Sequence, residues 1–348
     1  MNATTKNKKQ NTNKQYDVIG LGNALLDLTI DVDDLFLESV HLAKGTMTLV
    51  DEEKYSQILQ KIVDIPKDKS SGGSSSNAIK GVSILGANSA FIGMVGNDDY
   101  GTNYEQELQK SGVKTILSKT NKNTGTAITF ITNDGERTFA TYLGASLEFS
   151  EKNIDESTAT AITNSKILHI EGFFLEPPQH RLAALKAMNI AKENGIKVSV
   201  DLSDPHLIFR NKEFFKEVIE KYVDIVFVNE HEAKAFTELE DVEAAHHLSK
   251  YCEYSIVKLG PKGSIIKHGG KVHNIPIHNV EVINTNGAGD AYAAGILFGI
   301  AKGLSMDKSG EIAAFISGKV VERKEATLNY SLRNEVEKIL NENEIKTE

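Results

Sequence analysis

The second half of the chain alternates short apolar runs with helical stretches, and this alternation restricts the fold more than any other feature. Residues 167–170, 197–201 and 224–229 have the pattern of strands, and residues 178–193 and 212–221 have the pattern of helices. Strands that alternate with helices pair in parallel, and helices then cover both faces of the sheet. We therefore expect an α/β fold, a three-layer α/β/α sandwich with a mainly parallel central sheet.

The first half of the chain carries shorter strand patterns that favour a second, smaller sheet. Apolar and polar residues alternate within about 28–50, and a hairpin is expected within 126–142 around the Asn-Asp-Gly turn at residues 133–135. We expect these segments to build a small β-sheet lid. Because no Pro/Gly-rich linker separates the two halves, residues 16–342 are expected to form a single domain that includes this lid.

Composition narrows the class of protein. A net charge of −9 argues against nucleic acid and anionic membranes as partners. The single cysteine, Cys252, excludes an intrachain disulfide and a cysteine-based zinc cluster, which fits a cytoplasmic protein. Residues 1–15 are polar and rich in Asn and Lys, so they are expected to be a disordered leader and not a secretory signal. No apolar run approaches the roughly 20 residues that a membrane span needs.

The most specific local pattern lies near the C-terminal end. A β-branched run at residues 280–283 is expected to end a strand, and an almost wholly apolar helix follows it. The backbone N–H groups of Gly287, Ala288 and Gly289 would lie open at the positive end of that helix, where anions bind. Asp290 beside an anion site suggests a general base next to a transferring phosphoryl group. The alternative is that the glycines form a tight turn and Asp290 caps the helix.

Residues 284–290, Asn-Thr-Asn-Gly-Ala-Gly-Asp, resemble the Asp-Thr-x-Gly-Ala-Gly-Asp signature of the ribokinase-like (PfkB-type) sugar and nucleoside kinases. The resemblance extends over roughly residues 16–327, with the elements in the family's order. It implies a ribokinase-like fold and transfer of the γ-phosphoryl group of ATP to a primary hydroxyl, with Asp290 as the base. Asn284 stands where the family has Asp, and this departure bears on whether a monovalent cation such as K⁺ binds nearby.

The resemblance also implies two substrate-binding stretches. Gly-Asn-x-Leu-Leu-Asp resembles the opening of adenosine kinases, in which the Asn and the Asp contact a ribose, and here these residues are Asn23 and Asp27. A Gly-Gly-x-x-x-Asn element that contacts sugar hydroxyls in the family matches Gly72, Gly73 and Asn77. Without the resemblance, the first stretch reads as an ordinary turn after a strand, and the second reads as a flexible linker.

Further matches concern phosphate, nucleotide and metal. Arg137 lies where related kinases place an arginine close to the phosphoryl path, although a surface arginine is an equal reading. Glu232 completes an Asn-x-x-Glu element and is expected to hold Mg²⁺ through a water molecule. A helix cap formed by that element is compatible with this role. A nucleotide loop is expected around residues 258–263, where a plain hairpin turn would need the same glycines. The expected ATP-binding residues are Asn229, Lys258, Gly260, Gly263 and Asn286.

The expected reaction is phosphorylation of adenosine to AMP with ATP and Mg²⁺. Inosine, guanosine, or a sugar such as ribose, fructose or 2-keto-3-deoxygluconate are the alternative acceptors. The partners are expected to be small molecules, and the protein a monomer or a homodimer. Two other classes stay open at this point. An NAD-dependent oxidoreductase would rest on the glycines at residues 20–22, which lack the third glycine of a dinucleotide motif. A silent binding protein of the same fold would rest on Asn284 and on Ala326, which stands where the family has glycine.

Overall fold

The computed structural model describes residues 14–341, so the predicted leader lies almost entirely outside the described residues. A nine-stranded sheet has the order β14-β13-β12-β11-β10-β9-β1-β5-β6, and all its neighbours pair in parallel except β12–β13 and β13–β14. The mainly parallel sheet expected from the alternation is confirmed. Its strands are β1 (Tyr16–Leu21), β5 (Ser89–Gly96), β6 (Lys114–Thr120), β9 (Ser165–Glu171), β10 (Lys197–Asp201), β11 (Ile225–Asn229), β12 (Tyr254–Lys258), β13 (Ser264–His268) and β14 (Lys271–Ile275).

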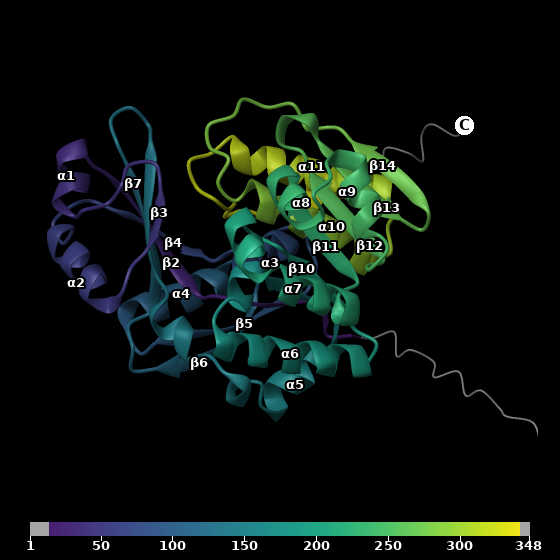
Figure 1. The fold of residues 1–348 in the computed structure, drawn as a ribbon, viewed down its shortest axis with the longest axis horizontal. Coiled ribbons are helices and arrows are strands. Elements are labelled where there is room, and N and C mark those ends of the chain that lie inside the picture. Colours follow the sequence, from purple (N-terminus) through teal and green to yellow (C-terminus); the bar gives the residue numbers. More distant parts are fainter. Residues whose placement is uncertain (1–13, 342–348) are drawn as a thin grey trace, which may run out of the picture.

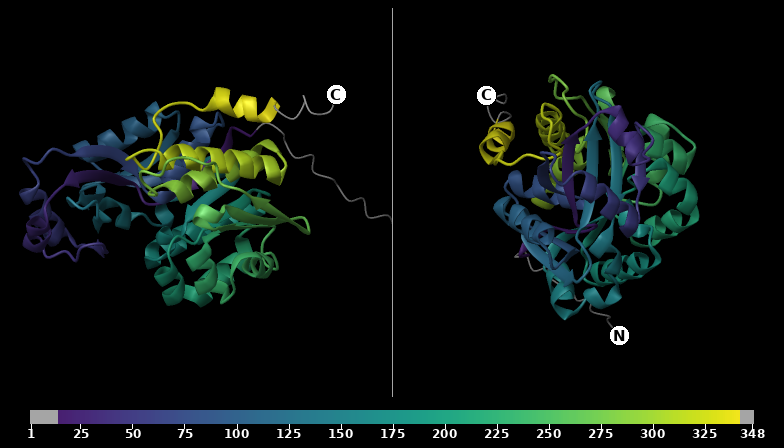
Figure 2. Two further views of the ribbon diagram at one scale, coloured as in Figure 1. Left: turned by 90° about the horizontal axis from the view of Figure 1, so that it is seen from above. Right: turned by 90° about the vertical axis from the view of Figure 1, so that its left-hand side faces the viewer.

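Helices cover both faces of this sheet, as the two views in Figure 2 show. Neighbouring residues of β1 belong to different apolar clusters: the cluster of Val18 includes residues of α3, α10 and α11, and the cluster of Ile19 includes residues of α5, α6 and α7. None of the helices within residues 14–341 is long and apolar enough to cross a membrane. The helices beside the large sheet are α3 (Ser74–Ile84), α4 (Asp99–Lys110), α5 (Glu156–Thr163), α6 (Pro178–Glu193), α7 (Pro205–Tyr222), α8 (Glu230–Thr237), α9 (Asp241–Leu248), α10 (Ala288–Lys302), α11 (Met306–Val321) and α12 (Arg333–Asn341), with 3₁₀ turns at Gly144–Glu148, Glu151–Asn153, Gly172–Leu175 and Gly260–Lys262.

A second, five-stranded sheet stands at one side of the molecule, with two short helices beside it (Figure 1). Its order is β3-β8-β7-β2-β4, and β7 and β8 form the expected antiparallel hairpin. Strand β4 comes from the stretch whose composition favours a linker, and it pairs with β2. The elements are β2 (Leu25–Asp31), β3 (Met47–Leu49), β4 (Asp68–Gly72), β7 (Gly125–Ile131) and β8 (Arg137–Tyr142), with α1 (Asp34–Ser39) and α2 (Glu52–Lys61).

Several local predictions were wrong. No strand forms at residues 280–283, where Val282 and Ile283 are mostly exposed. The N–H of Ile283 donates to the carbonyl of Val321 at the end of a helix, and among residues 14–341 no strand pairs with this segment. Strand propensity describes the fit to a half-buried, paired surface, and that surface is missing here. Helix α7 begins at Pro205, seven residues before the helix expected at residues 212–221, and has a kink at Asn211.

Strand β1 lies between β9 and β5, which makes it the point where the direction of strand addition reverses. From β1 the chain adds β5 and β6 on one side and later β9 to β12 on the other. In open α/β sheets, ligands bind at the carboxyl ends of the strands flanking such a reversal. The turn after β1 begins at Gly22, and β9 ends at Glu171, so both lie at this edge of the sheet.

Candidate active site

The amino end of α10 has the geometry expected of an anion-binding turn. Gly287 precedes the helix with a φ of +77°, and a Cβ there would lie 2.0 Å from the carbonyl oxygen of Ala326. Only glycine fits this position. The N–H of Ala288 donates to the carbonyl of Thr285, so this one of the three predicted amides is already engaged. The N–H groups of Gly287 and Gly289 have no acceptor among the described residues and are available to a ligand.

Asp290 lies in the first turn of α10 but does not cap it, which makes the capping interpretation wrong. The N-cap residue is Gly287, and no side chain caps the helix. Instead, Oδ1 of Asp290 accepts a hydrogen bond from Oγ of Ser74 at 2.7 Å, and Oδ2 accepts one from Nδ2 of Asn77 at 3.0 Å. Burial raises the pKa of Asp290 to about 6, although these two hydrogen bonds oppose the rise. The carboxylate is therefore ionised at neutral pH yet basic enough to take up a proton.

Gly72 and Gly73 leave space for the carboxyl group of Asp27 and the backbone carbonyl of Asn23. A Cβ on Gly72 would lie 2.3 Å from the carboxyl group of Asp27, and a Cβ on Gly73, where φ is +94°, would lie 2.2 Å from the carbonyl oxygen of Asn23. Burial raises the pKa of Asp27 to about 7, the charge of Lys80 opposes this, and the charge of Asp290 adds to it. The glycines therefore bring the two predicted ribose ligands close to the entrance of α3.

Asn23 is buried, and its side chain is largely engaged within the protein. Its amide Nδ2 donates to Oε1 of Glu171 at 2.8 Å, and its Oδ1 accepts from Oγ of Ser146 at 2.7 Å. The amide of Asn77 is also buried, and its Oδ1 has no partner among the described residues. That oxygen is thus free to accept a hydrogen bond next to Asp290. Sequence reasoning missed Glu171, although a carboxylate at the end of a central parallel strand was a usable signal.

Arg137 joins the small sheet to the anion-binding turn. Its Nη1 donates to Oδ1 of Asn284, and Nδ2 of Asn284 donates to the carbonyl of Lys324 at 2.6 Å. Arg137 is therefore not a free surface arginine in this arrangement. The N–H of Asn286 also donates to Oδ1 of Asn284, at 2.9 Å, and Asn286 itself is exposed beside the turn.

Lys258 brings a positive charge to the same place from the end of β12. Its Nζ donates to Oδ2 of Asp201 at 2.6 Å, and a Cβ on Gly289 would lie 3.3 Å from this Nζ. Burial alone would lower the pKa of Lys258, but the carboxylates of Asp201 and Glu232 outweigh it and raise the pKa. Asp201, at the end of β10, was missed from the sequence and holds the ammonium against the first turn of α10.

Asn229 and Glu232 form the expected helix cap at α8. Oδ1 of Asn229 accepts from the N–H of Glu232, and the two oxygens of Glu232 accept from the backbone and side-chain amides of Asn229 at 2.7 and 2.6 Å. Burial raises the pKa of Glu232 to about 7, and the nearby charge of Asp201 adds to the rise. Direct metal ligation by Glu232 would have to displace these amides, and residues 14–341 contain no group of three His, Cys, Asp or Glu arranged for a metal.

The two glycines of the predicted nucleotide loop differ in their surroundings. Gly263 has a φ of +88°, and a Cβ there would lie 2.1 Å from the carbonyl oxygen of Ile275, so the β12–β13 turn requires it. Gly260 has a φ of +55° and open space around its Cβ position. The turn therefore explains both glycines, Gly263 through a close contact and Gly260 through its positive φ.

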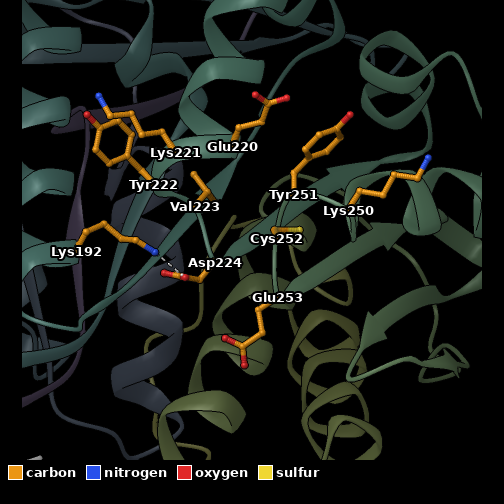
Figure 3. A pocket seen from close by; sticks show the side chains of 10 residues that line it. All are labelled: Lys192, Glu220, Lys221, Tyr222, Val223, Asp224, Lys250, Tyr251, Cys252 and Glu253. Atoms are coloured by element: carbon orange, nitrogen blue, oxygen red, sulfur yellow. Dashed lines mark hydrogen bonds and ion pairs between the residues drawn. The ribbon is translucent and has the colours of Figure 1, made fainter. Parts of the chain in front are cut away.

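A surface hollow lies at the opposite edge of the sheet, where β11 and β12 begin (Figure 3). Its lining is mostly charged, with Lys192 bonded to Asp224 at 2.9 Å. Cys252 is buried there, and burial raises the pKa of its thiol to about 12, so the thiol is unreactive at neutral pH. None of the predicted site residues borders this hollow.

Known proteins resemble this chain in sequence and fold. Adenosine kinase from Saccharomyces cerevisiae is 28% identical over 321 residues, which is 86% of this chain and 93% of that protein. The crystal structure of adenosine kinase from Sinorhizobium meliloti matches with a TM-score of 0.84 at 31% identity, covering 93% of this chain and 99% of the other. A probable sugar kinase protein from Rhizobium etli matches with a TM-score of 0.84 at 29% identity, covering 93% and 98%.

The family comparison agrees with the geometry of the site. Residues 67–332 match the model of the pfkB family carbohydrate kinases. That range contains Asp290, its partners Ser74 and Asn77, and the pair of Lys258 and Asp201. The ribokinase-like resemblance is thereby confirmed, and the chain belongs to the pfkB carbohydrate kinase family.

Proposed function

We propose that this protein transfers the γ-phosphoryl group of ATP to the primary hydroxyl of a ribosyl nucleoside, with adenosine as the first candidate and AMP as the product. The observation that carries the proposal is the position of Asp290, a partly buried carboxylate oriented by two hydrogen bonds at an anion-binding helix end. The likeness to adenosine kinases from yeast and Sinorhizobium meliloti supports a nucleoside acceptor.

In this mechanism the chain mainly positions groups and stabilises charge. The ionised Asp290 accepts the proton of the acceptor hydroxyl as its oxygen bonds to the γ-phosphorus, and the bond to the leaving ADP oxygen breaks. The free N–H groups of Gly287 and Gly289 would stabilise charge on the phosphoryl oxygens, and Lys258 adds positive charge from the side of β12. Asn23, Asp27, Gly72, Gly73, Asn77 and Arg137 are proposed on the acceptor side.

On the nucleotide side we place Asn229, Lys258, Gly260, Gly263 and Asn286. Mg²⁺ neutralises the polyphosphate when bound, and a magnesium ion that keeps several waters needs few protein ligands. Glu232 fits a role through water, because both of its oxygens already accept amide hydrogens. A monovalent cation such as K⁺ is also proposed near this turn, where Asn284 offers a neutral amide oxygen in place of the carboxylate of the family signature.

We further propose that residues 16–342 act as one domain with the five-stranded sheet as its lid. The apolar cluster that includes Leu28, Ile128 and Phe130 of the small sheet continues to Ala294 and Ile312 under the large sheet, which supports one unit. The single cysteine supports a cytoplasmic location. A monomer and a homodimer remain the two expected states.

A sugar acceptor is the second candidate, supported by the likeness to the probable sugar kinase from Rhizobium etli. Asp27 and Asn77 suit vicinal hydroxyls of either a ribose ring or a free sugar. Two adjacent aromatic residues come just after β9. Phe174 is buried, with its ring centroid 4.3 Å from that of His180, so it does not distinguish a nucleoside from a sugar acceptor. Phe173 is 38% exposed, and its ring is available to stack on a purine.

The deciding experiment measures ADP release with MgATP across adenosine, inosine, guanosine, ribose, fructose and 2-keto-3-deoxygluconate. We expect the highest kcat/KM for adenosine, and turnover on a free sugar alone would move the assignment to a sugar kinase. Asp290→Asn should lower kcat by about 10²- to 10⁴-fold, because general-base catalysis contributes that much, while MgATP still raises the melting temperature. Near-normal turnover by this variant would refute the role of Asp290.

A further inference from the structure

Glu171 is a buried carboxylate that no step of the mechanism uses. It is the last residue of β9, beside the central strand β1, and only 2% of its surface is exposed. Within residues 14–341 it forms no ion pair, and its hydrogen bonds come from N–H groups alone. An unpaired buried carboxylate is costly, so its retention at this edge of the sheet calls for a role.

The two oxygens of Glu171 hold two different segments of the site. Oε1 accepts from the backbone N–H of Asn23 at 2.9 Å and from its side-chain Nδ2 at 2.8 Å. Oε2 accepts from the backbone N–H of Ser75, in the first turn of α3, at 2.6 Å. One carboxylate therefore connects the turn after β1, on the acceptor side, with the amino end of α3.

The amino end of α3 is also where the partners of Asp290 lie. Ser74 precedes Ser75 and donates to Oδ1 of Asp290, and Asn77 follows it by two residues and donates to Oδ2. The three segments approach one another closely at Gly22, where a Cβ would lie 2.8 Å from Cβ of Ser75 and 3.1 Å from Cδ of Glu171. A shift of Glu171 would therefore move the acceptor turn and the base relative to each other.

We propose that Glu171 is a positioning residue that sets the distance between the acceptor-binding turn at Asn23 and the general base Asp290, by anchoring Asn23 and the first turn of α3 to the end of β9. The inference rests on the proposed function, in which these two segments hold the acceptor and the base. Burial raises the pKa of Glu171 to about 7, although its hydrogen bonds from Asn23 and Ser75 oppose the rise.

The test compares Glu171→Gln with Glu171→Ala, using Glu193→Gln at the exposed end of α6 as the matched control. Glutamine keeps an acceptor for Asn23 but turns an NH₂ group toward the N–H of Ser75. We expect its kcat to fall about 100-fold, as for an ångström-scale misplacement, with the KM for MgATP within about twofold of wild type. Alanine releases both segments, so the KM for the acceptor should rise as well.

A kcat for Glu171→Gln within about twofold of wild type would overturn the inference. An equal loss in kcat and in both KM values, the KM for MgATP included, would also overturn it, since that indicates general damage to the fold.

Amide hydrogen exchange supplies a readout that needs no turnover. Exchange over residues 74–79 should be faster in Glu171→Gln and unchanged over residues 178–193, and unchanged exchange over both would overturn the anchor. Wild-type protein that is inactive on every acceptor would refute the proposed function, while exchange would still decide the anchor.

Discussion

Removing the hydroxyl of Ser74 should change the pH dependence of turnover more than its maximum. This hydroxyl donates to Oδ1 of Asp290 at 2.7 Å and lowers the pKa of a carboxyl group whose burial raises it to about 6. A hydrogen bond to a charged group contributes about 1.5–3 kcal/mol, and about 1.4 kcal/mol corresponds to one pH unit. Because Asp290 is only partly buried, water would replace part of the lost bond, and we take about one pH unit for Ser74→Ala.

The sign follows from the role of Asp290 as a base, which works only when ionised. Activity is lost as the pH falls through the pKa of Asp290, so a higher pKa moves the acidic limb of the profile upward. The ionised fraction at pH 5.5 would fall about eightfold in Ser74→Ala, and at pH 7 about twofold, whereas at pH 8 the two proteins would be nearly equal. The assay is kcat/KM for ADP release from pH 5 to pH 9, because this ratio reports the pKa of the base in the free protein, to which the value of about 6 refers.

A serine on the same helix supplies the control. Oγ of Ser83 donates to the carbonyl of Ser111, away from Asp290, so Ser83→Ala should reproduce the wild-type profile. A Ser74→Ala profile that coincides with wild type would refute the hydrogen bond as a determinant of the base. A loss of equal size at every pH would show that Ser74 acts on geometry alone.

Two further predictions concern the anion-binding turn and its positive charge. Gly287→Ala should lower kcat about 100-fold through displacement of the turn, because its Cβ would lie 2.0 Å from the carbonyl oxygen of Ala326. The control is Gly303→Ala, which has a similar φ of +71° but open space around the Cβ position, and it should keep turnover in the same kinetic assay. Lys258→Met should lower the free energy of unfolding by about 3–5 kcal/mol in urea denaturation, because Asp201 loses its partner, and should raise the KM for MgATP. An unchanged urea midpoint would contradict the buried pair.

Much of the fold could be predicted from the sequence, because periodicity and capping are local properties. The pattern over residues 178–193 coincides with α6, and the Asn-x-x-Glu element forms the expected cap of α8. The Gly-Ala-Gly-Asp run likewise indicates an anion site and a candidate base through residues that are adjacent in the chain. The strand expected at residues 280–283 failed for a non-local reason, since β-branched residues form a strand only where a neighbouring strand can pair with them.

The partners of the site residues were decided by the tertiary structure alone. Ser74 and Asp290 are 216 residues apart in the chain, and Asn23 and Glu171 are 148 apart, yet each pair is hydrogen-bonded. The sequence determined which segments become strands, helices and glycine turns, because those preferences lie within a few neighbouring residues. The carboxyl ends of the parallel strands converge only in the packed sheet. This convergence decides which carboxylates lie close together, which glycines make room for them and how far burial raises their pKa.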